Sequence, residues 1–123
     1  MGASRGEARM RDEVYSAVMN SSFGLSLGAV WQHMTMEMGD VGISGRRDAF
    51  FELMGRLLRD RKVKLASDGR TLEGDWREQL LFISKAWPES PGEDDIDGFG
   101  LWFLIDAPAG LVWISADGRE HWT

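Results

Sequence analysis

The sequence Phe99-Gly-Leu-Trp-Phe-Leu-Ile-Asp-Ala-Pro-Ala-Gly-Leu-Val-Trp-Ile114 is the most hydrophobic part of the chain, and it decides the fold that we predict. Residues 101–105 and 111–114 are two short runs of apolar, β-branched and aromatic side chains, which a five-residue loop separates. This pattern is typical of two antiparallel strands, and we expect 101–105 to pair with 111–115. Neither face of the first run is polar, so other elements must cover this sheet.

Apolar side chains recur with helical spacing in four segments outside this stretch, over 10–20, 27–38, 46–59 and 76–87. Ser26 can cap the second helix through its hydroxyl, and Asp75 with Glu78 three residues later has the pattern of a capping box at the start of the fourth. Pro88 ends that fourth helix. Because apolar side chains recur every three or four residues in each of these segments, we predict one helix over each of the ranges 10–20, 27–38, 46–59 and 76–87.

Two Asp-Gly pairs mark turns. Asp68-Gly69 lies between β-prone segments and predicts a hairpin, because both residues of that turn type need a positive φ. Asp117-Gly118 predicts that the chain doubles back once more near its C-terminal end. We therefore expect a single α+β domain over 1–123, with about four helices packed on one side of a small antiparallel sheet and a C-terminal β-meander. Residues 1–8 have little to bury and are expected to be disordered.

Composition limits the chemistry that is available. With 123 residues, 43% of them hydrophobic, the chain is long enough to bury one core. The absence of cysteine rules out disulfides, zinc–thiolate sites and thiol nucleophiles. The N-terminal residues lack the apolar region of a signal peptide, and no apolar run reaches the roughly 18 residues that a membrane span needs. We expect a cytoplasmic protein that is not embedded in a membrane.

The charge of the chain is unevenly distributed. Residues 1–72 hold 11 Lys and Arg against 9 Asp and Glu, whereas residues 73–123 hold 3 against 11. An acidic surface repels phosphate backbones and attracts basic ones, so the second half favours a basic protein partner over nucleic acid. The alternative is that these carboxylates only keep a tryptophan-rich domain soluble.

The middle of the chain allows a second function. The predicted helix over 46–59, followed by the Asp68-Gly69 hairpin, is the order of a winged helix, in which the helix enters a DNA groove and the hairpin touches phosphate. Acidic residues interrupt the same helix, and the rest of the chain is acidic, so a DNA-binding regulator is the alternative rather than our preference. The cations that would serve this function are Arg46, Arg47, Arg56, Arg59, Arg61, Lys62 and Lys64.

No pattern in the sequence predicts catalysis. The oxygens of Glu93, Asp95 and Asp97 fit the first positions of a calcium loop, but the twelfth position would be Leu104 and not a carboxylate. His33 and Glu37 are four residues apart on one predicted helix, and nothing else completes a catalytic site around them. We therefore expect no enzymatic activity, no cofactor and no bound metal.

A combination of segments in the C-terminal half resembles a known group of proteins. The segments are Val-Lys-Leu, Asp-Gly and Leu-Glu-Gly within 63–74, a tryptophan-ended helix over 75–87, and Gly-Leu-Val-Trp-Ile…Asp-Gly…Glu-His-Trp-Thr over 110–123. Over about residues 26–123 the chain resembles a family of small, uncharacterised bacterial proteins. Small acidic bacterial proteins of this kind are similar to immunity proteins, which bind and block a toxin. The resemblance implies a binding protein and supplies no catalytic residue.

The acidic loop before the hydrophobic stretch is our candidate binding site. Its carboxylates can speed the encounter with a basic toxin, and the neighbouring tryptophan can supply desolvated contact energy. The identity of the partner and the formation of a homodimer are left open by these residues. The predicted contact residues are Glu93, Asp94, Asp95, Asp97 and Trp102.

Overall fold

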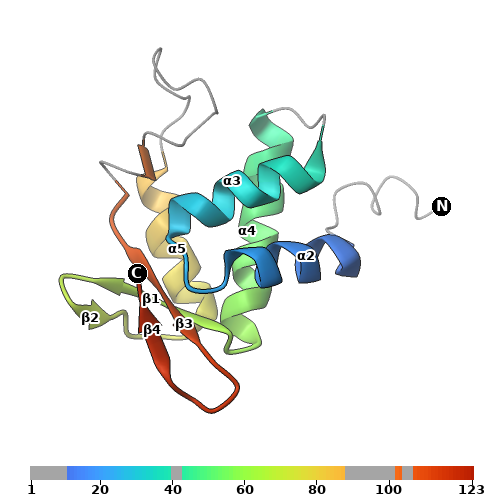
Figure 1. Ribbon diagram of the computed structural model, residues 1–123. Helices are drawn as coiled ribbons and strands as arrows, with labels where there is room; N and C mark the ends of the chain where they lie inside the picture. The colour runs from blue at the N-terminus through green and yellow to red at the C-terminus, as the bar shows by residue number, and fades with distance from the viewer. Residues whose placement is uncertain (1–10, 40–42, 88–101, 104–106) are drawn as a thin grey trace.

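A computed structural model describes residues 11–39, 43–87, 102–103 and 107–123 of the protein (Figure 1). In these ranges four helices and a four-stranded antiparallel sheet confirm the α+β class. The described helices are all too short or too polar to traverse a lipid bilayer. The elements are α2 (Asp12–Ser22), α3 (Leu27–Met38), α4 (Ile43–Arg59), β1 (Val63–Ser67), β2 (Arg70–Thr71), α5 (Trp76–Ala86), β3 (Gly110–Ile114) and β4 (Glu120–Trp122).

Local chemistry sets the starts of α3 and α5 and the β1–β2 turn where the sequence predicts them, whereas α2 begins at Asp12 and α4 at Ile43 instead of at the predicted residues 10 and 46. The Ser26 hydroxyl accepts a hydrogen bond from the Ala29 amide at 3.3 Å and caps α3. Asp75 and Glu78 form the complete capping box at the start of α5. Asp68 lies in the left-handed region with a φ of 54°, as a tight turn between β1 and β2 requires.

The sheet joins strands that are far apart in the sequence. Its order is β2-β1-β3-β4, with β3 between β1 and β4. Trp113 on β3 lies opposite Val63 on β1 and opposite His121 on β4. The chain turns back after β3 through residues 115–119, which confirms the predicted C-terminal reversal.

The predicted pairing of 101–105 with 111–115 is wrong. β3 pairs with β1 and β4 instead, and Trp102 and Phe103 are helical; residues 101, 104 and 105 lie outside the described residues. Successive side chains of a strand point to opposite faces, whereas both of these rings lie against Trp87, at 5.0 and 5.5 Å between centroids. A short apolar run has no period that separates a buried helical turn from a strand.

One face of the sheet belongs to the core. Because side chains alternate along a strand, Val63 and Leu65 of β1 share this face with Trp113 of β3, and all three are buried with the helices. The opposite face carries an ion pair between Lys64 and Glu120, whose charged atoms are 2.8 Å apart. The helices therefore cover one side of the sheet, as predicted.

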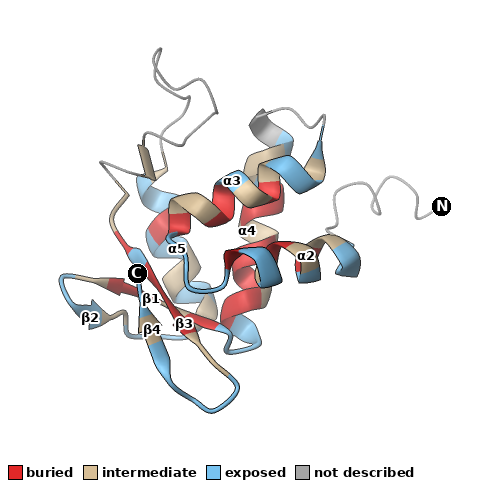
Figure 2. Ribbon diagram, viewed as in Figure 1, coloured by how far each residue is buried: buried red, intermediate tan, exposed pale blue. Residues whose placement is uncertain are grey.

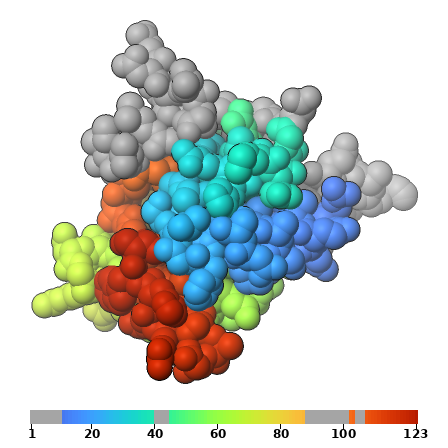
Figure 3. Space-filling view, in the orientation of Figure 1, coloured from blue at the N-terminus to red at the C-terminus, as the bar shows by residue number. Residues whose placement is uncertain are grey.

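The turn between α2 and α3 covers the end of this sheet. The Trp113 indole N–H donates to the carbonyl oxygen of Leu25 at 2.9 Å. The Phe23 ring lies 5.4 Å from the Trp113 ring and 5.3 Å from the His121 ring. In the space-filling view the segment that follows α2 (blue) lies against the C-terminal strands (red) (Figure 3).

Helix α4 lies at the centre of the core. Phe50 is completely buried and its ring contacts those of Trp31, Phe103 and Trp87, at centroid distances of 5.6, 5.3 and 5.7 Å. Figure 2 shows the buried residues concentrated along α4 and on the sides of α2 and α3 that face it. The other fully or almost fully buried side chains on α4 are Ala49, Leu53, Met54, Leu57 and Leu58.

This burial does not agree with a winged helix. A recognition helix must present one whole face to a DNA groove. Among residues 45–59 of α4, only Gly45, Asp48 and Arg59 are exposed. The winged-helix arrangement is therefore not confirmed, because neighbouring elements cover most of the helix in the place of the recognition helix.

We expect Phe50→Ala to lower the free energy of unfolding by about 3–5 kcal/mol, because it removes a ring with contacts on several sides and leaves a cavity. Phe82→Ala is the matched control, since Phe82 on α5 is 42% exposed and its loss should cost about 0.5 kcal/mol. Urea denaturation of both variants measures the difference. Equal losses would mean that α4 is not the centre of the core.

Tyr15 ties α2 to the end of α4. Its hydroxyl donates to the Asp60 carboxylate at 3.3 Å, and the Arg56 guanidinium lies 3.9 Å from the centre of its ring. Burial of the hydroxyl, reinforced by the nearby Asp60 charge, raises the pKa of Tyr15 to about 12.

We expect part of the stability to be lost between pH 10 and pH 12. The unfolded chain releases the Tyr15 proton at about pH 10, whereas the folded chain keeps it to about pH 12, so the contribution is complete below pH 10 and declines as the pH rises. Tyr15 is the only tyrosine, so tyrosinate absorbance reports its pKa directly. Urea denaturation at pH 9 and pH 11 should show a larger loss for wild type than for Tyr15→Phe. Equal losses in the two proteins would refute this assignment.

Candidate functional site

The predicted binding residues are only partly within the structure. Glu93, Asp94, Asp95 and Asp97 lie outside the described residues. Trp102 is half-buried, and its ring contacts Trp87 and Phe103, at 5.0 and 5.1 Å between centroids. One part of this side chain therefore belongs to the aromatic core, and the remainder is open to solvent.

The two histidines serve different parts of the fold. His33 Nδ1 lies 2.9 Å from the Ser21 hydroxyl and 3.2 Å from the Ser22 hydroxyl, so the imidazole connects α3 to the last turn of α2. His121 lies on β4, opposite Trp113. Across the described ranges, no group of three or more His, Asp or Glu side chains could hold a metal ion.

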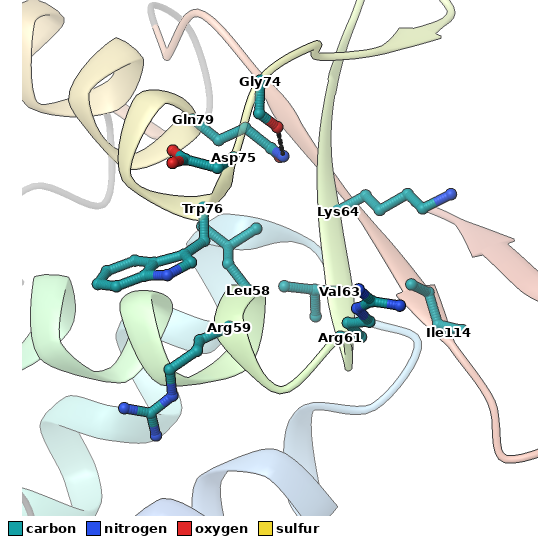
Figure 4. Close-up of a pocket in the computed structure, with 10 residues that line it drawn as sticks. All are labelled: Leu58, Arg59, Arg61, Val63, Lys64, Gly74, Asp75, Trp76, Gln79 and Ile114. Carbon is teal, nitrogen blue, oxygen red and sulfur yellow. Dashed lines mark hydrogen bonds between the residues drawn. The ribbon is translucent and has the colours of Figure 1, made fainter.

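A cavity of about 430 Å³ lies where α4, β1 and α5 meet (Figure 4). Leu58, Val63, Trp76 and Ile114 give it apolar walls. Its other lining residues are Arg59, Arg61, Lys64, Gly74, Asp75 and Gln79. The sequence alone did not predict this cavity, because its residues come from segments that are far apart in the chain.

Two of the three cations around this cavity are neutralised by carboxylates. Arg59 Nε lies 3.4 Å from an oxygen of Asp60, and Lys64 Nζ lies 2.8 Å from an oxygen of Glu120. The hydrogen bond from Lys64 lowers the pKa of the Glu120 carboxyl below its usual value. In Figure 4 the charged ends of Arg59 and Lys64 point away from each other. They therefore do not converge on one ligand position.

Asp75 and Gln79 hold the backbone around the cavity. Asp75 accepts the Glu78 amide at 2.9 Å as the cap of α5. Gln79 accepts the Leu65 amide at 3.2 Å and donates to the carbonyl of Gly74 at 3.1 Å. These bonds use one carboxylate oxygen of Asp75 and both ends of the Gln79 amide to hold the backbone.

Arg61 is unusual among the residues of this region. Helix α4 ends in a Schellman motif, in which the Lys62 amide donates to Leu57 and the Arg61 amide to Leu58, at 2.9 and 3.1 Å. Arg61 occupies the left-handed position of this motif with a φ of 59°, where glycine is the usual residue. Residues 60–62, between the predicted helix and the following strand, contain no glycine. This indicates from the sequence that a residue with a Cβ must adopt the left-handed conformation at the helix end.

A second cavity, of about 470 Å³, lies on the other side of Arg61. Arg61 and Ile114 line both cavities. The second one lies between the end of α2, the α4–β1 turn and the end of β3. Its remaining lining residues are Met19, Asn20, Phe23, Lys62, Trp113, Ser115 and Ala116.

We expect Arg61→Gly to raise the free energy of unfolding by about 0.5–1 kcal/mol, because glycine has no Cβ to strain in the left-handed region. Arg59→Gly is the control: Arg59 is the last residue of α4, and glycine there should lower stability by about 1 kcal/mol. Thermal or urea unfolding gives both signs. A loss of stability in Arg61→Gly would show that the Arg61 side chain supports the fold.

Known proteins are similar to this chain in sequence and in fold. A search of curated proteins gave no match. The structure is similar to that of an uncharacterised protein conserved in bacteria, from Neisseria meningitidis, with a TM-score of 0.76 and 26% sequence identity over 89% of this chain and 87% of the other. The model of a family described as "Protein of unknown function, DUF596" matches residues 58–123, just over half of the chain. The chain therefore belongs to the DUF596 family, whose members are proteins of unknown function.

Proposed function

We propose that this protein is a non-catalytic bacterial protein-binding module of the immunity type, which neutralises a basic toxin in the cytoplasm. The observation that carries the proposal is an exposed apolar pair on α5. Leu81 is 50% exposed and Phe82 is 42% exposed. Large apolar side chains that remain in water at neighbouring positions are typical of a surface that a partner covers.

The acidic stretch that follows α5 in the sequence supports a basic partner. Within one turn of Leu81 and Phe82 the charge of α5 is mixed, because Arg77, Glu78 and Lys85 are all exposed. The helix leads along the chain towards the acidic stretch 93–97 and Trp102. The carboxylates of that stretch would steer a cationic protein towards the surface, and the apolar side chains would then slow its dissociation.

The polar side chains at the first cavity and His33 form hydrogen bonds that hold the fold, which supports a non-catalytic role. Asp75 and Gln79 at the first cavity cap a helix and hold backbone, and His33 connects two helices. A catalytic group needs a free lone pair or proton aimed at a substrate. The exposed surface of α5 offers contact area instead.

The test begins with the gene that precedes this one, because an immunity gene should lie directly after its toxin gene. With that toxin in hand, we expect Phe82→Ser to weaken the complex about tenfold or more, mainly through faster dissociation. The fourfold variant Glu93→Gln, Asp94→Asn, Asp95→Asn and Asp97→Asn should slow association and reduce its salt dependence. Trp102→Ala should speed dissociation. Surface plasmon resonance at two salt concentrations separates these effects.

Met36→Ser is the matched control, since Met36 is the most exposed large apolar side chain of the described residues, at 72%, and lies on α3. Its affinity for the toxin should not change. Unchanged affinity of Phe82→Ser, Trp102→Ala and the fourfold variant would contradict the proposed surface. Sequence-dependent nanomolar binding of duplex DNA that weakens steeply with salt would support the DNA-binding alternative instead.

A further inference from the structure

The second cavity combines an aromatic wall with a size that suits a small molecule. Trp113 is almost completely buried, and the hydrogen bond from its indole to Leu25 fixes the ring in place. Phe23, 5.4 Å away between centroids, is 44% exposed, so aromatic surface remains open to solvent at this point. The volume of about 470 Å³ lies within the range of about 300–1,000 Å³ that is usual for ligand sites.

Positive charge lines the same cavity. Arg61 and Lys62 both lie on its edge, and neither forms an ion pair with another residue in the described part of the chain. The carboxylates nearest in the sequence have other partners. Asp60 accepts from Tyr15 and Arg59, and Asp117 from Ser115 and Arg119. Two cations beside an aromatic wall therefore remain available to an anion.

The backbone of Arg61 gives an independent reason to assign a role to this side chain. A φ of 59° costs an arginine more than it costs a glycine, and the Schellman bonds at this position need only the backbone. Glycine would serve the helix end better. A strained residue at the edge of a cavity is an observation from which a function can be inferred.

From these observations we propose that the second cavity binds a small anionic molecule with an aromatic or apolar body. The anionic group, a carboxylate, sulfonate or phosphate, pairs with Arg61 and Lys62, and the body lies against Phe23 and Trp113. This surface is separate from the α5 surface that we assign to a protein partner, so either function can fail without the other.

Two probes that share the same rings, one with a sulfonate group and one without it, test the proposal. The first is 8-anilinonaphthalene-1-sulfonate, and the second is N-phenyl-1-naphthylamine, which has the same rings without the sulfonate. Fluorescence titration of the full chain should show saturable binding of the sulfonate, at least about fivefold tighter than that of the neutral amine. The indole N–H resonance of Trp113, assigned with Trp113→Phe, should shift in the same titration.

Arg61→Gly should weaken sulfonate binding by about fivefold or more and should bring the two probes to similar affinity. Lys62→Gln should weaken it in the same direction. Because glycine relieves strain at position 61, this loss is not a consequence of unfolding, which thermal unfolding of the variant verifies. Arg70→Gln is the control, since Arg70 is an exposed cation on β2 that does not line the cavity, and it should leave both affinities unchanged.

Three results would overturn the proposal. One is equal affinity of the two probes for wild type, since the cations would then add nothing. Another is sulfonate affinity of Arg61→Gly within twofold of wild type. The last is a set of shifted resonances that omits the Trp113 indole, which would place the probe on another apolar surface, such as Leu81 and Phe82 of α5.

Discussion

The contacts of the Phe50 ring determine how the rest of the molecule can be arranged. Phe50 brings α4 against Trp31 of α3, against Trp87 after α5, and against Phe103. The Phe103 ring in turn contacts that of Trp102. Aromatic rings bury large areas and prefer tilted or edge-to-face contacts, and these pairs have interplanar angles of 41–71°. These contacts cover α4 on several sides, and its exposed residues over 45–59 are Gly45, Asp48 and Arg59. The large apolar side chains that are exposed among the described residues lie outside this helix.

The exit from α4 connects this core to the sheet. The chain changes from helix to strand within three residues, and the two Schellman hydrogen bonds make this reversal possible. The carbonyl of Lys62 then accepts the Ile114 amide at 2.9 Å, which extends the pairing of β1 with β3. The reversal also places Arg61 and Ile114 between the two cavities. The end of α4 reverses the chain, and it also brings the positive charge of Arg61 to the edge of the second cavity.

Helix α5 buries fewer of its side chains than α4 does. Ile83 is its only fully buried side chain, while Trp76 and Leu80 are partly buried against the core. The capping box at Asp75 and Glu78 satisfies backbone donors at the helix start, which supports a helix that buries little of its own surface. Leu81 and Phe82 can then remain exposed without loss of the helix. This is the property that a contact surface for a partner needs.

Sequence by itself determined the features that depend on neighbours in the chain: the caps at Ser26 and at Asp75, the turn at Asp68, and the amphipathic periods that give the helices and the α+β class. Tertiary structure decided the rest. The apolar run around Trp102 has no period, so the sequence could not show that Trp102 and Phe103 are helical, and their packing against Trp87 accounts for it. The partners of β3, the hydrogen bonds of His33 and the two cavities beside Arg61 join segments that are distant in sequence, and no local preference specifies which distant segments meet.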